Sequence, residues 1–225
     1  DLVVHPQQNT EIDLVNQLSD FHDDMAWLES DKLSLVHCEE QVRKVNWKIL
    51  VEGGLEAYHF KVAHKNTIGP FFCDNLSTYR ASGNHIRSIL TKNTISDLQS
   101  ESEASWQVRD HAQVLYTLFP SSALLVQSDH IAWIRFEPQA VDETRLFIST
   151  LVPSDQIETE SQRQHWQKNH HITVNTLNED FDIGESIQAG LSSGANQQLT
   201  FGRFEGALAT FNEAVDRALS AGSNA

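Results

Sequence analysis

The sequence of 225 residues contains only two cysteines, Cys38 and Cys73, together with 10 glycines and 5 prolines. So few cysteines form no disulfide framework and no C-x-x-C pair, which is typical of proteins from a reducing compartment. The scarcity of glycine and proline excludes collagen-like and linker-like chains. The sequence also lacks a signal peptide and any run of the roughly 20 apolar residues that a membrane-spanning helix requires, so we expect a cytoplasmic protein with no membrane partner.

Positive charge is scarce as well, because 16 lysines and arginines face 31 aspartates and glutamates and leave a formal net charge of −15. A chain this acidic repels a phosphate backbone, so we expect no nucleic acid partner. Apolar residues make up 40% of the chain and charged residues 21%, proportions that are normal for a globular protein. The length suits one domain, which we expect to span residues 1–225.

The second half of the chain has the pattern of an antiparallel sheet. Runs of β-branched and aromatic residues, separated by short polar turns, occupy residues 114–119, 123–127, 131–136 and 145–152. Connections this short favour a meander, because parallel strands need long crossovers. Further strands of the same sheet are predicted at residues 33–38, 77–80 and 85–90. Apolar residues at spacings of three and four predict an amphipathic helix over 204–219, so we expect an α+β fold in which a curved sheet grips a long C-terminal helix.

The segment 46–64 holds two imidazoles five residues apart, His59 and His64, and a carboxylate, Glu56, three residues before the first. Positions five apart on a regular helix diverge by about 140°, so a shared metal ion requires an i to i+5 turn or a helix that ends between the two histidines. The spacing of the two histidines is not the H-E-x-x-H of zinc proteases, so the sequence does not favour a zinc protease.

A third ligand is expected from residues 178–191, read as a helix. Asp180 is the acid in line with the apolar positions Ile183 and Ile187. The other acids of the segment face away from that stripe: Glu179, Asp182 and Glu185. A buried carboxylate is costly unless it is paired, protonated or bound to a metal. Two histidines and one carboxylate suit a non-haem Fe(II) centre that activates dioxygen.

Plainer interpretations stand beside these. Asp180 could be a helix cap or a first-turn acid, and Glu56 a surface acid on a helix. Imidazoles on polar segments are usually solvated, so we do not expect ligands at four other histidines: His111, His130, His170 and His171. Asn46 is expected to cap a helix and Trp47 to fill the core. Core packing is also the default for the aromatic residues Phe60, Phe71, Phe72, Trp133 and Phe204.

The whole motif resembles the catalytic domain of Rieske-type non-haem iron oxygenases, the ring-hydroxylating α-subunit group. That family's pattern is N-W-K, a carboxylate followed by Asn, an acid three residues before a His, and a second His five residues later. The chain has N-W-K-I-L-V-E-G-G-L-E-A-Y-H-F-K-V-A-H and, far downstream, E-D-F-D-I-G-E-S-I-Q. The resemblance covers about residues 33–219 and implies a helix-grip fold of the START or Bet v 1 type.

The same resemblance implies site residues and cofactors. His59, His64 and Asp180 would hold a mononuclear Fe(II), and Glu56 would be the catalytic acid that links this iron to the Rieske 2Fe-2S cluster of a neighbouring subunit. The implied activity is O2-dependent hydroxylation of a small organic substrate, an aromatic one by preference. The implied partners are a reductase or ferredoxin that donates electrons, within a homotrimer.

Three features depart from the family pattern. Gly53 stands where many members have Asn, and Glu56 replaces the Asp common in dioxygenases, a change seen in branches that act on quaternary amines. The Rieske signature C-x-H with a later C-x-x-H is absent. We therefore expect the N-terminal Rieske domain to lie outside this sequence, which begins at Asp1 as part of a longer polypeptide.

Two alternatives remain open at this point. One is a monooxygenase of the same family that acts on a quaternary amine or N-methyl group, which an aromatic cage would favour. The other is a redox-inactive helix-grip module that only binds a ligand. Iron content separates both oxygenases from the ligand-binding module.

Overall fold

One antiparallel sheet of seven strands organises the described residues, 13–195 and 198–222, of the computed structural model. The strands are β1 (Leu33–Arg43), β2 (Phe72–Ser82), β3 (His85–Lys92), β4 (Ala112–Leu118), β5 (Ser122–Val126), β6 (Ile131–Ala140) and β7 (Glu143–Pro153). Their order is β1-β7-β6-β5-β4-β3-β2, so the chain from β2 to β7 is a meander and β1 pairs beside β7. Every predicted strand is present. The domain predicted over residues 1–225 includes residues 1–12, 196–197 and 223–225, which lie outside the described part.

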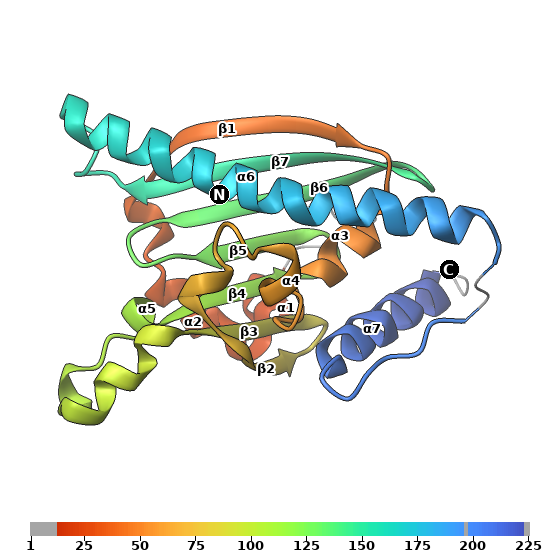
Figure 1. The fold of residues 1–225 in the computed structure, drawn as a ribbon, viewed down its shortest axis with the longest axis horizontal. Coiled ribbons are helices and arrows are strands. Elements are labelled where there is room, and N and C mark those ends of the chain that lie inside the picture. The colour runs from red at the N-terminus through yellow and green to blue at the C-terminus, as the bar shows by residue number, and fades with distance from the viewer. Residues whose placement is uncertain (1–12, 196–197, 223–225) are drawn as a thin grey trace.

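Helices cover the sheet. They are α1 (Leu14–Leu18), α2 (His22–Trp27), α3 (Trp47–Gly53), α4 (Phe60–Ala63), α5 (Val108–His111), α6 (Glu160–Ser192) and α7 (Gly206–Gly222). Short 3-10 helices are η1 (Ser19–Phe21), η2 (Ser30–Lys32), η3 (Gly69–Phe71), η4 (Asn93–Ser100) and η5 (Glu103–Ser105). Figure 1 shows α6 running along the sheet near β1, β7 and β6, with α3 and α4 beside it. This arrangement confirms the predicted α+β helix-grip class.

The longest helix, α6, extends well beyond the segment 178–191 that was read as helical. It has 33 residues and begins with a capping box, in which Oγ1 of Thr159 accepts from the backbone N–H of Gln162 at 3.2 Å and Oε1 of Gln162 accepts from the N–H of Thr159 at 2.8 Å. Its buried side chains include Trp166, Val174 and Phe181. The helix predicted over 204–219 is also present, as α7, so α6 is the long helix that lies across the sheet and α7 follows it.

The main core lies between the inner face of the sheet and helices α3, α6 and α7. Its members include Val45, Leu146, Ile148, Phe181 and Phe211, each no more than 2% exposed. Asn46 caps α3 as predicted, because its Oδ1 accepts from the N–H of Lys48 at 3.0 Å. Trp47 packs edge-on against Phe211 with ring centroids 5.9 Å apart, which ties α3 to α7.

A second cluster covers the other face of the central strands. Leu28 lies in it with Val114, Tyr116 and Leu118 of β4, whereas Leu115 belongs to the main core. Alternate residues of β4 therefore point into two different cores, and the whole strand is buried. The central strands are therefore packed on both faces, and their inner face meets the main core.

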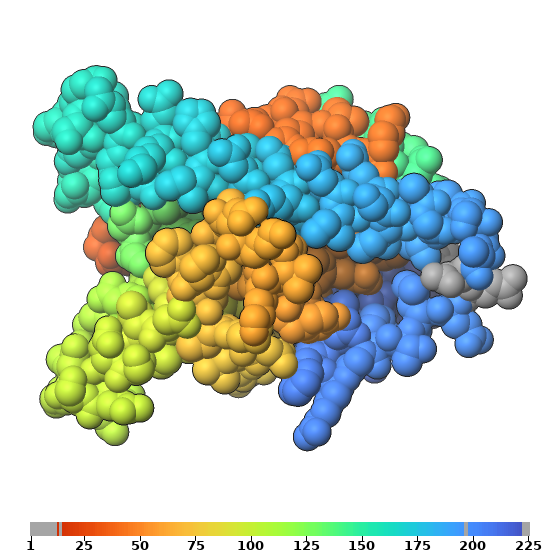
Figure 2. Space-filling view, viewed as in Figure 1, coloured from red at the N-terminus to blue at the C-terminus, as the bar shows by residue number. Residues whose placement is uncertain are grey.

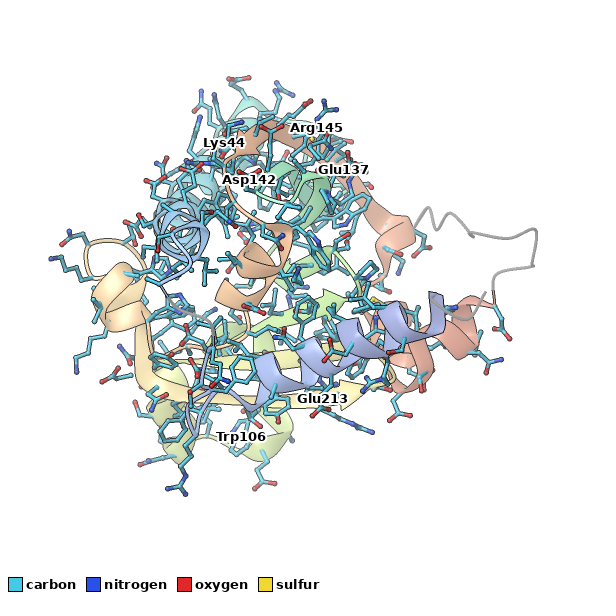
Figure 3. All side chains as sticks on the ribbon, turned by 90° about the vertical axis from the view of Figure 1, so that its right-hand side faces the viewer. Lys44, Trp106, Glu137, Asp142, Arg145 and Glu213 are labelled. Atoms are coloured by element: carbon cyan, nitrogen blue, oxygen red, sulfur yellow. The ribbon has the colours of Figure 1, made fainter. Side chains whose placement is uncertain are left out.

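Charged side chains gather at the end of the sheet where β6 turns into β7. Figure 3 shows Lys44, Glu137, Asp142 and Arg145 together there, away from Glu213 on α7 and from Trp106. Arg145 Nε lies 3.4 Å from Oε1 of Glu40, and both side chains are about half exposed. Exposed pairs of this kind contribute little to stability. Within the described residues, no helix is both long and apolar enough to cross a membrane.

Candidate metal centre

A single helical turn separates the two histidines of the sequence motif. His59 precedes α4 and His64 follows it, so the helix begins and ends between them, as their spacing requires. The backbone N–H of Gly69 then donates to the carbonyl oxygen of His64 at 2.9 Å, an i to i+5 bond that folds the chain back. A Cβ on Gly69 would lie 2.7 Å from the carbonyl oxygen of Phe60 and 2.8 Å from that of His64. Only glycine fits this close approach.

Asp180 reaches the same point from α6. Its Oδ1 lies 3.0 Å from Nε2 of His64 and 3.4 Å from Nε2 of His59. One ligand atom from each of the three residues lies within 4.8 Å of the others. In Figure 2 the orange segment that carries α4 lies against the cyan-to-blue α6, so these two elements meet over the sheet. The structure therefore brings together all three residues predicted as metal ligands.

A carboxylate holds the outer nitrogen of each imidazole. Nδ1 of His59 contacts Oε1 of Glu56, and Nδ1 of His64 lies 2.7 Å from Oε2 of Glu179. A carboxylate only accepts hydrogen bonds, so Nδ1 of each ring donates to its glutamate, and Nε2 is the nitrogen that faces Asp180 and would bind a metal once its own proton is displaced. Metal-binding histidines are generally oriented in this way. Thr67 donates from Oγ1 to the same Oε2 of Glu179 at 2.7 Å and fixes that carboxylate in turn.

The position of Glu179 corrects the sequence interpretation, which placed it facing away. The predicted apolar stripe is not the buried face, because Ile183 is 44% exposed and Ile187 is 46% exposed. The inward neighbours of Asp180 are Phe181 and Gly184. Consecutive helix residues diverge by about 100°, so Glu179 and Asp180 approach one ring from two sides. The tandem of two acids was the signal that could have revealed this.

The site is strongly polarised. Burial alone would lower the pKa of His59, but its contacts with Asp180 and Glu56 outweigh burial and raise that pKa to about 9. The pKa of His64 is raised for the same reasons, against its burial, by Asp180 and Glu179. The pKa of Asp180 is lowered by the two imidazoles although its burial opposes the change. The two histidines thus carry protons at the positions where a divalent cation would take their place.

The donor atoms fit a divalent transition metal. The three ligand atoms lie within 4.8 Å of one another, so the two imidazoles and the carboxylate would hold one divalent cation between them. Two imidazole nitrogens and one carboxylate on one side of a metal are typical of non-haem Fe(II) with open positions. His64 is fully buried, whereas the side chains of His59 and Asp180 are 19% and 23% exposed. The described residues therefore suit iron.

A cavity of about 120 Å³ adjoins the three ligands. Its lining is mainly apolar and includes Leu50, Leu115, Ile134, Phe136, Ile172 and Phe181. A cavity of about 150 Å³ with such a lining can hold benzene, so this one suits a ring of similar size. Phe60 lines the cavity as well as the core, whereas Phe71 and Phe204 are 66% and 64% exposed, against the prediction of core packing.

The four other histidines considered from the sequence lie outside this cluster: His111, His130, His170 and His171. His130 and His170 are buried, so the expectation that they are solvated was wrong. Nδ1 of His130 contacts Oδ1 of Asp129 at 2.7 Å, and Nδ1 of His170 contacts Oγ1 of Thr150 at 2.9 Å. Within the part of the chain that the structure describes, the metal-type cluster consists of His59, His64 and Asp180.

Comparisons with known proteins point in one direction. The family model described as "Ring hydroxylating alpha subunit (catalytic domain)" matches residues 20–221. A search of curated protein sequences gives no significant match.

Solved structures share the fold at low sequence identity. A quaternary ammonium Rieske monooxygenase, studied for carnitine oxidation by gut microbiota, superimposes with a TM-score of 0.74 and 17% identity over 93% of this chain and 57% of that chain. Naphthalene 1,2-dioxygenase from Rhodococcus sp. gives a TM-score of 0.64 and 13% identity over 92% and 62%. NdmB from Pseudomonas putida CBB5 gives 0.55 and 16% over 91% and 54%. The chain spans less than two thirds of the length of each of these proteins.

Proposed function

Since the chain belongs to the ring-hydroxylating α-subunit family of Rieske non-haem iron oxygenases, as its match over residues 20–221 shows, we propose that it is the iron-bearing catalytic domain of an oxygenase that hydroxylates a small aromatic substrate. The observation that carries the proposal is the convergence of His59, His64 and Asp180 beside an apolar cavity. When bound there, Fe(II) supplies the activation of dioxygen.

Residues of the chain itself orient the metal ligands, hold the substrate and exclude water. Glu56 and Glu179 keep the protons of the two imidazoles on Nδ1, so that both Nε2 atoms are free to bind the metal. The apolar lining excludes water and holds the ring of the substrate next to the open side of the centre. His64, which is 1% exposed, keeps the far side of the site closed.

Glu56 has a second proposed role, as the acid through which electrons pass from a Rieske cluster of a neighbouring subunit. Its side chain is 11% exposed and contacts His59, so it connects a ligand to the outside of the site. The proposed partners follow from this role: a Rieske 2Fe-2S domain outside residues 1–225, a reductase or ferredoxin, and a trimer. In the full-length protein, Glu56→Gln loaded with Fe(II) to about one iron per chain should lose turnover by at least about tenfold.

The quaternary-amine alternative rests on two observations. Glu56 stands where dioxygenases commonly have Asp, and a quaternary ammonium monooxygenase shares the fold. The cavity supplies only part of an aromatic cage, because its aromatic residues are Phe60, Phe136 and Phe181, and Phe binds cations less well than Trp or Tyr. We therefore prefer an uncharged substrate.

Iron binding tests the proposal. The protein is purified without oxygen, loaded with Fe(II), and its iron is measured alongside His59→Ala, Asp180→Ala and a control, Asp182→Ala, whose side chain is 69% exposed on the same helix. The expected result is about one iron per chain in the parent and the control, and none in the two ligand variants. A parent that binds no iron would favour the redox-inactive ligand-binding module.

A further inference from the structure

Two glutamines lie side by side on the sheet wall of the cavity. Gln113 belongs to β4, and Gln127 follows β5. Gln113 precedes Val114 and Gln127 follows Val126, two residues that pair across β4 and β5, so the glutamines are neighbours at the end of this strand pair. Both glutamines line the cavity next to the candidate metal centre.

These amides have no partner in the described part of the protein. Gln113 is only 5% exposed, yet its side chain makes no hydrogen bond to any described residue, and the same holds for the side chain of Gln127. The hydroxyl of Thr117, which is 3% exposed and also lines the cavity, is likewise without a partner among those residues. Buried polar groups are nearly always hydrogen-bonded, so Gln113 and Thr117, together with the half-buried Gln127, offer hydrogen-bonding groups that a ligand in the cavity could complete.

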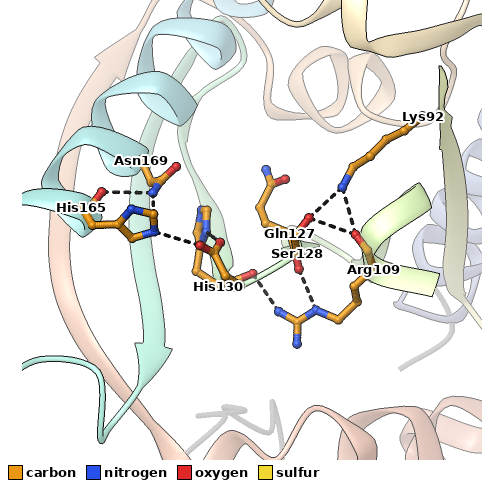
Figure 4. Close-up of polar contacts among 8 residues, drawn as sticks. Lys92, Arg109, Gln127, Ser128, His130, His165 and Asn169 are labelled. Atoms are coloured by element: carbon orange, nitrogen blue, oxygen red, sulfur yellow. Dashed lines mark hydrogen bonds and ion pairs between the residues drawn. The ribbon is translucent and has the colours of Figure 1, made fainter. Parts of the chain in front are cut away.

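The backbone around Gln127 is held in place from the opposite side. Arg109 donates from Nε to the carbonyl oxygen of Gln127 at 2.7 Å and from Nη2 to that of His130 at 3.3 Å. Lys92 donates from Nζ to Oγ of Ser128 at 2.8 Å. Figure 4 shows these contacts, and it shows the amide of Gln127 pointing away from the Arg109 guanidinium. The backbone that carries Gln127 is thus held in place, and the side chain of Gln127 lines the cavity.

The lining also sets the charge of the ligand. Apart from His59, His64 and Asp180, no ionisable side chain is among the described residues that line the cavity. A carboxylate or ammonium group of a substrate would be buried there without a counter-ion, which is costly. An uncharged ring with a polar edge avoids this cost and satisfies the amides.

We propose that Gln113 and Gln127 form an amide-recognition pair, and that the substrate is an uncharged ring carrying an N–H next to a C=O, as in a lactam. A glutamine amide offers one donor and one acceptor side by side, which match such an edge in a bidentate manner. The assignment of this ligand as a substrate rests on the proposed oxygenase function, whereas its binding does not require iron.

Binding to the metal-free chain tests the proposal. The probes are 2-pyridone, its analogue 1-methyl-2-pyridone, which lacks the N–H, and toluene, which has no polar edge; dissociation constants are measured by NMR titration. We expect 2-pyridone to bind at least about tenfold more tightly than 1-methyl-2-pyridone. Gln113→Leu and Gln127→Leu should each weaken 2-pyridone by about tenfold and leave toluene unchanged or tighter. The exposed control Gln139→Leu should change neither.

The outcomes separate this proposal from the proposed function. His59→Ala should lose iron and still bind 2-pyridone, and the two glutamine variants should bind iron like the parent. If 2-pyridone fails to bind the parent, or binds both leucine variants as tightly as the parent, the amide pair is refuted whatever the iron content. Tighter binding of benzoate or phenyltrimethylammonium than of 2-pyridone would refute it too.

Discussion

Nδ1 of His64 lies 2.7 Å from Oε2 of Glu179, and the residue after Glu179 presents Oδ1 to Nε2 of the same ring at 3.0 Å. Both nitrogens of the His64 ring therefore contact consecutive residues of α6, Glu179 and Asp180. These two contacts fix the orientation of the ring, and Nδ1 donates to Glu179. This relationship makes Glu179 a positioning residue for the centre.

Glu179→Gln should weaken iron binding without abolishing it. The amide can present its NH2 group to Nδ1, which removes the preference for the proton on that nitrogen. We expect the affinity for Fe(II) to fall by about 10–100-fold, as for other outer partners of metal ligands. Competition with a chelator measures the loss, and Asp182→Asn, at an exposed acid of the same helix, is the control. Equal affinities in both variants would show that Glu179 does not orient the ring.

Gly69→Ala should damage the turn that carries the histidines. The added Cβ would meet the carbonyl oxygens of Phe60 and His64, which are backbone atoms that cannot rotate away. We expect the free energy of unfolding to fall by about 1–3 kcal/mol and iron loading to fall with it. Urea denaturation and iron analysis measure the two effects.

Gly190→Ala is the matched control for that substitution. Gly190 lies in α6 with no atom within 4 Å of an added Cβ, so alanine should stabilise the helix by about 0.5–1 kcal/mol. A similar loss of stability in both variants would show that the close contact at Gly69 is not the cause.

Stability should fall as the pH drops below 6.5, in part because of His85. Burial lowers the pKa of His85 below 6.5, although its hydrogen bond to the carbonyl oxygen of Gln17 opposes the shift. Nδ1 of the neutral ring accepts from the N–H of Phe119 at 3.0 Å, and protonation breaks this bond. The unfolded chain binds the proton first, so the contribution is complete above pH 6.5 and is lost as the pH falls toward the lowered pKa.

The measurement for His85 is the difference between the parent and His85→Gln, which does not titrate. Urea midpoints between pH 7.5 and pH 5 should show a steeper decline in the parent, by up to about 1.4 kcal/mol per pH unit. Parallel curves would mean that His85 is not the group responsible.

Arg43 should stabilise α6 near the metal ligands. Its guanidinium donates to Oδ1 of Asp182 at 2.8 Å and to Oδ1 of Asn178 at 2.6 Å, and it lies 5.5 Å from the ring centroid of Phe181. We expect Arg43→Met to lower the free energy of unfolding by about 1–3 kcal/mol.

Arg80→Met, which removes an exposed ion pair with Asp20, should cost less than about 0.5 kcal/mol. Denaturant titration compares the two variants. Equal small losses would mean that the contacts of Arg43 are as weak as ordinary surface pairs.

The strands were predictable because most of them alternate or run as continuous apolar segments between polar turns. The first half of α6 was not, since residues 160–173 are rich in polar side chains and bury only a few, such as Trp166 and His170. Its start is encoded in the Thr159 capping box, a local signal that needs no apolar period.

The three candidate ligands could be predicted from spacing and from the family resemblance, and the structure brings them together. Glu179 was placed wrongly, because the exposed Ile183 and Ile187 give a false apolar face, although the consecutive acids Glu179 and Asp180 are a local signal for it. Gln113 was equally hidden: only the register of β4 shows that it points inward with Leu115 and Thr117. The orientations of Glu179 and Gln113 both depend on long-range packing, which a local sequence pattern does not contain.

Glu179 and Asp180 contact the same His64 ring, so the number of residues that precede them in α6 matters more for this contact than the identity of those residues. Between Trp166, fixed in the sheet's packing, and Glu179, each added or deleted residue would turn the acids by about 100° around the helix. Solvent-facing positions of this segment can therefore drift widely over evolutionary time, whereas a single in-frame insertion or deletion would disconnect the helix from the histidines at once.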